Sequence, residues 1–195
     1  MGWEDMNANK YKFKYFMNPE TNAEFTEENC QFCGTEEKCL EGEYFDRGDE
    51  ITSVCLDCLV KGETTVQIPQ YLKDRLYTHL KNTFTEKNSE ELNELFESII
   101  SELEKNPPVP WIQYNDWPVC DGDFMQYVGE WKQEDFNNAS QNGNGKDYIV
   151  SILDDLTKSR INDIDVFWND IGNYTAVFVF KCLHCNKIIG VAQSY

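Results

Sequence analysis

The chain has 195 residues, enough for one domain with a buried core, or for one domain plus a small metal-stapled module. It carries 35 acidic and 17 basic side chains, a net charge of −18 at pH 7. This charge argues against a nucleic-acid ligand, because phosphates attract lysine and arginine. The excess acid either keeps the protein soluble or attracts a basic protein partner.

Nothing in the sequence favours secretion or insertion into a membrane. The first twenty residues contain Glu4, Asp5 and several lysines, and they lack the apolar centre of a signal peptide. The longest apolar run, 175–180, is far shorter than the roughly 20 residues that span a bilayer. We therefore expect a cytoplasmic protein with no membrane partner, in which reduced cysteines bind metal more often than they bind each other.

The N-terminal third is predicted to be a small module that needs a metal. Aromatic residues alternate with lysines over 11–15, which predicts a short strand, and Asn18-Pro19 predicts a turn. Residues 30–60 are acidic and poor in apolar side chains, so this segment needs a cross-link or a metal to fold. We expect a zinc-knuckle or zinc-ribbon-like module over residues 1–66.

Two amphipathic helices are expected in the middle of the chain. Pro69 suits a first helical position, and leucines recur every four residues from Leu72. A second helix begins near Asn88, with Glu91 as its capping partner, and ends before the prolines at 107–110. Its charged face carries Glu90, Glu94 and Glu97.

The last third begins with an aromatic-rich segment over 111–131. Residues 137–146 have the composition of a mobile loop, and a third helix is expected over 147–160. The apolar residues predicted for the inner face of this helix are Ile149, Ile152, Leu153 and Leu156.

The chain is predicted to close with a β-hairpin. Residues 174–181 and 188–193 are rich in β-branched residues, and a Cys-x-x-Cys sequence forms the turn between them. The expected fold class is α+β, with the N-terminal zinc module, a helical middle and this hairpin. Residues 67–195 would form an α+β domain, which can pack with the module as one unit.

Six of the eight cysteines form three Cys-x-x-Cys pairs. Two intervening residues let a tight turn direct both sulfurs at one tetrahedral ion. The first two pairs are 21 residues apart, close to the spacing of zinc modules, and predict one structural four-thiolate zinc site. Redox disulfides and an iron–sulfur cluster are the alternatives. The predicted zinc ligands are Cys30, Cys33, Cys55 and Cys58.

The third pair, Cys182 and Cys185, needs two more ligands to hold a second zinc. Cys120, in a turn-like segment, is the predicted third ligand. The alternative is that these thiols are ordinary buried cysteines. Four residues are candidates for the fourth position: His184, Asp121, Asp123 and Cys39.

The sequence argues against most kinds of enzyme. His79 and His184 are the only histidines, too few for a histidine-rich hydrolytic site, and His79 is expected on a helix surface. Phosphate-binding loops and the nucleophile elbow are missing. The alternative to a non-enzymatic protein is a small-ligand binder or metalloenzyme, whose pocket would combine the aromatic segment 111–131 with Asp121, Asp123 and the third cysteine pair.

Several motifs occur in an order that resembles the CbrC family, small bacterial proteins linked to colicin tolerance. Asp121 stands between Cys120 and Gly122, where that family has Cys-Gly-Asp. The resemblance implies a tolerance or immunity role and no known reaction. It rests on Lys12-Phe13-Lys14-Tyr15-Phe16, Cys30-x-x-Cys33-Gly34, Cys55-Leu56-Asp57-Cys58, Pro110-Trp111-x-Gln113 and Phe180-Lys181-Cys182-Leu183-His184-Cys185.

Charge and resemblance together predict a zinc-binding, non-enzymatic immunity protein that binds a basic partner such as a nuclease toxin domain. Nuclease toxins must be basic to bind phosphates, so an acidic inhibitor can compete for the same surface. The candidate contacts are Glu90, Glu94 and Glu97 on the second helix, or the acidic run 36–50.

Overall fold

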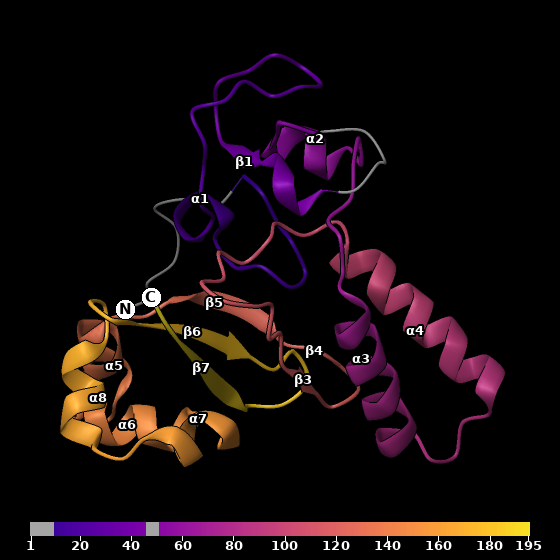
Figure 1. The fold of residues 1–195 in the computed structure, drawn as a ribbon. Helices are drawn as coiled ribbons and strands as arrows, with labels where there is room; N and C mark the ends of the chain where they lie inside the picture. The colour runs from indigo at the N-terminus through magenta and orange to yellow at the C-terminus, as the bar shows by residue number, and fades with distance from the viewer. Residues whose placement is uncertain (1–9, 46–50) are drawn as a thin grey trace, which may run out of the picture.

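The computed structural model describes residues 10–45 and 51–195. Helices and small antiparallel sheets form three adjoining parts (Figure 1): an N-terminal module, a helical hairpin, and a three-stranded sheet covered on one face by short helices. This arrangement confirms the α+β class, with the cysteine-rich segment near the N-terminus and paired strands at the C-terminus.

The N-terminal module is built around a two-stranded antiparallel sheet in which Cys39 lies opposite Cys55. Its elements are α1 (Pro19–Asn22), β1 (Cys39–Glu41), the 3-10 helix η1 (Gly42–Tyr44), β2 (Ser53–Cys55) and α2 (Leu56–Val60). The sheet is too small to bury a core of its own, so the module depends on other contacts for stability.

The predicted strand over 11–15 is extended chain with the expected alternation of burial, since Tyr11 and Tyr15 are buried and the lysines between them are exposed. Backbone pairing is confined to its end. The amide of Tyr127 donates to Tyr15 O, and the amide of Met17 donates to Tyr127 O, both at 2.8 Å. The predicted strand is not formed, because no segment among the described residues pairs its backbone with residues 11–14.

The helical hairpin consists of α3 (Gln70–Thr83) and α4 (Ser89–Leu103). Pro69 is the N-cap of α3, one position before the predicted one. Asn88 and Glu91 form the predicted capping box, in which the Asn88 side chain accepts from two backbone amides and Glu91 accepts from Asn88 N. The apolar stripes of both helices face inward as predicted.

The C-terminal half contains a three-stranded sheet in the order β5-β6-β7, and a short β3–β4 hairpin precedes it. The strands are β3 (Val119–Cys120), β4 (Asp123–Phe124), β5 (Gln126–Glu130), β6 (Thr175–Lys181) and β7 (Ile188–Ser194). The helices are α5 (Gln133–Ala139), α6 (Gly145–Ile152), α7 (Asp155–Arg160) and α8 (Ile164–Asp170). The predicted hairpin of β6 and β7 is confirmed.

The single helix predicted over 147–160 is wrong, because the chain breaks after α6. Leu153 is extended and bridges Gly190, and the amide of Asp154 donates to Gly190 O at 3.1 Å. The Asp154 side chain then caps α7 by accepting from the Thr157 amide. As a consequence Leu156, predicted to face inward, is 50% exposed.

Strand β6 is buried on both faces. Phe178 and Phe180 belong to the main buried cluster, whereas Val177 and Val179 belong to a second cluster beneath α5–α8. This two-sided burial explains why β6 reads as a continuous apolar run and not as an alternating pattern.

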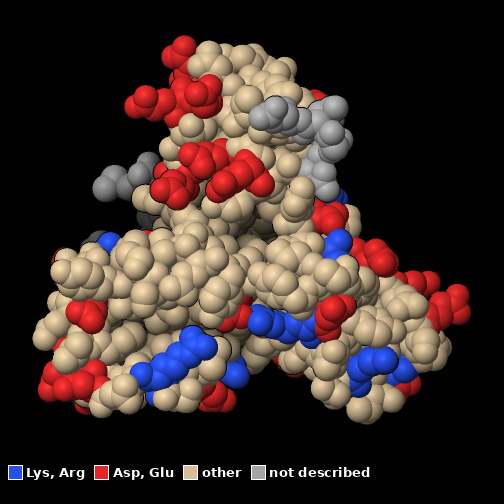
Figure 2. Space-filling view, viewed as in Figure 1, with Lys and Arg blue, Asp and Glu red and all other residues tan. Residues whose placement is uncertain are grey.

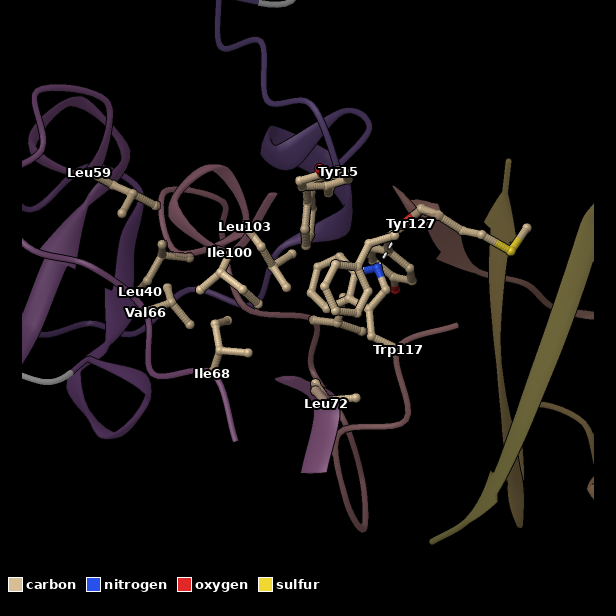
Figure 3. Packing of buried hydrophobic residues seen from close by; sticks show 14 of the residues in the cluster. Tyr15, Leu40, Leu59, Val66, Ile68, Leu72, Ile100, Leu103, Trp117 and Tyr127 are labelled. Atoms are coloured by element: carbon tan, nitrogen blue, oxygen red, sulfur yellow. Dashed lines mark hydrogen bonds between the residues drawn. The ribbon is translucent and has the colours of Figure 1, made fainter. Parts of the chain in front are cut away.

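The main buried cluster joins all three parts of the fold. Figure 3 shows Leu40 and Leu59 from the module close to Ile100 of α4, while Tyr15 and Trp117 lie between the helices and the sheet. The indole nitrogen of Trp117 donates to Met125 O at 2.7 Å. The domain boundary at residue 66 stays a prediction. None of the helices in the described ranges has the length and apolar content to cross a membrane.

Candidate metal centres

The first cluster consists of Cys30, Cys33, Cys55 and Cys58, which two separate segments bring together. The first pair lies on a tight turn in which the Gly34 amide donates to Cys30 O at 2.7 Å. Gly34 has φ 76°, a conformation that glycine adopts without steric cost. Cys55 ends β2 and caps α2, where its sulfur accepts from the amide of Cys58 at 3.4 Å.

The spacing of these sulfurs fits a tetrahedral metal ion. All four Sγ atoms lie within 4.8 Å of one another, and the Sγ atoms of Cys33 and Cys55 are 3.6 Å apart. Zinc–sulfur bonds of about 2.3 Å give a tetrahedron whose edges are about 3.8 Å. Three of the thiols are buried and Cys33 is exposed. The structure therefore brings together the four predicted ligands in a set that can hold a metal.

The thiol groups of the first cluster can all ionise only if a cation balances their negative charge. Burial opposes ionisation of Cys30, but backbone amides that point at its sulfur lower its pKa to about 6. Burial and the neighbouring thiols raise the pKa of Cys55 to about 11. Four thiolates cannot coexist here without a compensating charge, because all four sulfurs lie within 4.8 Å of one another and three of them are buried. A divalent cation removes this repulsion.

Cys39 lies beside the first cluster and is not one of its ligands. It is fully buried in β1, and its thiol donates to Thr35 O at 3.3 Å. Burial raises the pKa of this thiol. Its position opposite Cys55 in the module sheet removes Cys39 from the candidates for the second site.

The second cluster consists of Cys120, Cys182 and Cys185, as predicted. Cys120 ends β3, and the other two occupy the turn between β6 and β7. The three Sγ atoms lie within 4.8 Å of one another, with 3.7 Å between Cys120 and Cys185. The amide of His184 donates to the Cys182 sulfur at 3.4 Å. These thiols can hold a metal as well, again with a spacing close to a tetrahedral edge of about 3.8 Å.

The side chain of His184 turns away from the sulfurs and toward Asp123. Its Nε2 lies 3.0 Å from Asp123 Oδ2, which also accepts from Lys14 Nζ at 2.9 Å. The other oxygen, Oδ1, accepts from Tyr15 Oη at 2.6 Å and from the Phe124 amide at 2.9 Å. Burial opposes ionisation of Asp123, but these donors hold its pKa below the usual range. Within residues 10–45 and 51–195, no fourth metal-binding side chain joins the second cluster.

His79 has a role that the sequence did not reveal. It was expected on a helix surface, but its Nε2 accepts from the Gly122 amide at 3.1 Å, in the turn that follows Cys120. Burial lowers the pKa of His79, which favours the neutral imidazole that this hydrogen bond requires. One signal was present in the sequence: His79 lies three residues after Leu76, next to the apolar stripe of α3.

The aromatic segment 111–131 does not form one pocket with the second cluster. Trp111, Tyr114 and Trp117 line a cavity of about 480 Å³ between η1, α3 and the proline segment. No cysteine and neither Asp121 nor Asp123 lines it. The components expected to combine in a ligand pocket or metalloenzyme site therefore lie in two separate places.

The acidic side chains predicted to contact a partner are exposed. Glu90, Glu94 and Glu97 lie on the outer side of α4, and none forms an ion pair with a described residue. Figure 2 shows acidic side chains on the N-terminal module and toward the α4 side, with lysine and arginine mainly lower down. Of the acidic run 36–50, residues 46–50 lie outside the described residues.

A comparison with family models matches residues 11–193 to an uncharacterised protein family, UPF0167. No curated protein and no solved structure matches the chain. The matched region contains all seven cysteines of the two clusters as well as Asp123 and His184. The chain therefore belongs to the UPF0167 family, which is the CbrC family.

Proposed function

We propose that this protein is a zinc-binding, non-enzymatic immunity protein, whose four-cysteine site holds the N-terminal module in shape and whose acidic surface binds a basic partner. The observation that carries the proposal is the first cluster, in which four sulfurs lie within 4.8 Å of one another. Four protein thiolates leave no open coordination position, which is the property of a structural zinc site.

The module needs this zinc because its own contacts are few. Its sheet pairs only three residues from each strand, from Cys39 opposite Cys55 to Glu41 opposite Ser53. The turn that carries Cys30 and Cys33 is held mainly by single hydrogen bonds, such as Cys30 N to Thr35 O at 2.8 Å. In modules of this kind metal binding supplies the folding free energy, on the order of 10 kcal/mol.

The basic partner follows from charge. The protein carries −18 at pH 7, and Glu90, Glu94 and Glu97 on α4 are exposed and free of ion pairs to described residues. Such a face attracts a positively charged surface over several ångströms and increases the association rate. A nuclease toxin domain has such a positively charged surface, because it binds phosphates. The tolerance that the CbrC resemblance implies agrees with a toxin as the partner.

Zinc binding is tested by native mass spectrometry of the wild type, Cys55→Ser and Cys39→Ser. We expect Cys55→Ser to lose one zinc and the order of the N-terminal module. Cys39→Ser is the matched control, because Cys39 is buried in the same sheet but points its thiol at Thr35 O. A Cys55→Ser protein that keeps its zinc content and its stability would contradict the structural role of the first cluster.

Partner binding is tested with a panel of basic nuclease toxin domains at increasing salt concentration. Replacing Glu90, Glu94 and Glu97 by glutamine should weaken binding and flatten its salt dependence. A matched variant changes the exposed Glu24, Glu27 and Glu28 of the module to glutamine, which removes the same charge outside both candidate contact surfaces. If no basic domain binds the wild type, the proposed role of the acidic surface is refuted.

A further inference from the structure

We propose that the second cluster holds its zinc with only three thiolates and reserves the fourth coordination position for a thiol that comes from outside the fold. The proposal rests on the zinc chemistry proposed above, but not on the acidic partner surface. It concerns Cys120, Cys182 and Cys185, and it makes this site an exchangeable one, in contrast to the closed first cluster.

Three sulfurs are in place and a fourth protein ligand is missing from the described residues. The 3.7 Å between the Sγ atoms of Cys120 and Cys185 is close to the edge of about 3.8 Å expected when both bind one tetrahedral zinc. Zinc requires four ligands, and a site with three protein ligands takes its fourth from solution.

The nearest polar side chains are engaged elsewhere. Both oxygens of Asp123 accept two hydrogen bonds each, and the side chain is 5% exposed, so this carboxylate has no free lone pair to turn toward the metal. It also holds the Nε2 of His184 at 3.0 Å. His184 contributes its backbone amide to the Cys182 sulfur instead of its ring. Asp121 is exposed and its carboxylate does not join the three sulfurs.

The second cluster is also open to solvent. Cys185 is exposed and Cys120 is half-buried, whereas three of the four thiols in the first cluster are buried. The turn that carries Cys185 is exposed from Leu183 to Lys187. A ligand can therefore reach the sulfurs without displacing the core.

The chemistry around the site favours an anionic sulfur ligand. A zinc ion bound by three thiolates prefers a soft fourth ligand, such as a further thiolate, over a carboxylate. The exposed Lys181 and Lys187 flank the Cys-x-x-Cys turn, and Lys14 bonds the adjacent Asp123. Lys14 offsets the charge of Asp123, and Lys181 and Lys187 offset the added negative charge of the thiolate. The incoming thiol would displace the water molecule that otherwise fills the fourth position, and it gives its proton to solvent as its sulfur binds, so no electron is transferred.

The test uses full-length protein loaded with cobalt(II), whose visible spectrum reports the ligands of a tetrahedral zinc site, in buffer with a phosphine reductant. The spectrum of Cys120→Ser reports the first cluster alone. Subtracting it from the wild-type spectrum gives the spectrum of the second cluster. We expect 2-mercaptoethanol to shift the second spectrum and leave that of Cys120→Ser unchanged. Native mass spectrometry should show one retained thiol per two-metal chain.

His184→Gln separates the proposal from its main rival, ligation by the imidazole. We expect this variant to keep the second metal, the same spectrum and the same response to thiol. A reduced cysteine-containing peptide, used beside 2-mercaptoethanol, distinguishes a protein cysteine from a small thiol as the source, and a response to either supports the proposal.

Three results would overturn the proposal: loss of the second metal in His184→Gln, a second-cluster spectrum that ignores both thiols, or one metal per chain in wild type and Cys120→Ser alike. The last result leaves the proposed structural zinc intact, because that metal is lost only in Cys55→Ser. A wild type with no zinc at all would instead refute the proposed function.

Discussion

Replacing Gly122 by alanine tests how the turn that follows Cys120 is held in place. Gly122 has φ 78°, and an added Cβ would lie 2.4 Å from Cε2 and 2.6 Å from Cζ of Phe84. A left-handed conformation costs an L-residue about 1–2 kcal/mol. Moving the half-buried Phe84 ring out of the way adds about 1–3 kcal/mol. We therefore expect Gly122→Ala to lower the free energy of unfolding by about 2–5 kcal/mol.

The assay is urea unfolding followed by tryptophan fluorescence at a fixed zinc concentration. Gly62→Ala is the matched control, because Gly62 has φ 74° and its added Cβ meets nothing within 4 Å. It should cost only the conformational part, about 1–2 kcal/mol. In a Phe84→Leu background the ring atoms are gone, so Gly122→Ala should cost about 1–3 kcal/mol less than in the wild type. Equal costs for the two glycines, or no coupling to Phe84, would refute this reasoning.

Three further predictions follow from contacts described above. Tyr15→Phe removes the 2.6 Å hydrogen bond to Asp123 and should cost about 1.5–3 kcal/mol of unfolding free energy, measured in urea. Because the pKa of Asp123 is lower in the folded than in the unfolded state, ionised Asp123 stabilises the fold above the unfolded pKa near 3.8. This stabilisation is lost as the pH falls below that value. Tyr15→Phe should therefore make the free energy of unfolding less dependent on acid pH. Asn88→Ala removes the cap of α4 and should cost about 1 kcal/mol, in thermal unfolding, with no change in zinc content. A strong chelator should abolish amide protection over 30–45 and 51–58 before it affects 175–181 in hydrogen exchange, and simultaneous loss would show that the zinc supports the whole fold.

The features that the sequence predicted correctly depend on neighbours along the chain. The Cys-x-x-Cys turns, the Asn88 capping box and the β6–β7 hairpin are each encoded within a short segment, where residue type restricts the local backbone. The proximity of the third pair to Cys120 depends on a contact between distant segments, and the turn-like segment around Cys120 was its only local signal.

The features that it did not predict depend on contacts between distant segments. The bond between His79 and Gly122 spans 43 residues and exists only because α3 packs against the β3–β4 hairpin. The break at Leu153 is imposed by Gly190, in a strand that pattern alone cannot place beside it. Helical periodicity continued across this break, so local propensity pointed to the wrong answer and tertiary packing decided the structure.

The backbone pairing of Tyr127 sets the order in which segments can fold while the chain is being synthesised. One edge of this residue binds Tyr15 and Met17, and the other pairs with Phe180. While the chain leaves the ribosome, the four cysteines of the first cluster are all made before β5, whereas the segment 15–17 has no partner until β5 has been made, and β5 itself waits for β6. Contacts of such long sequence separation slow folding. The segment 15–17 therefore docks only after β6 has been made, later than the metal binding proposed for the first cluster.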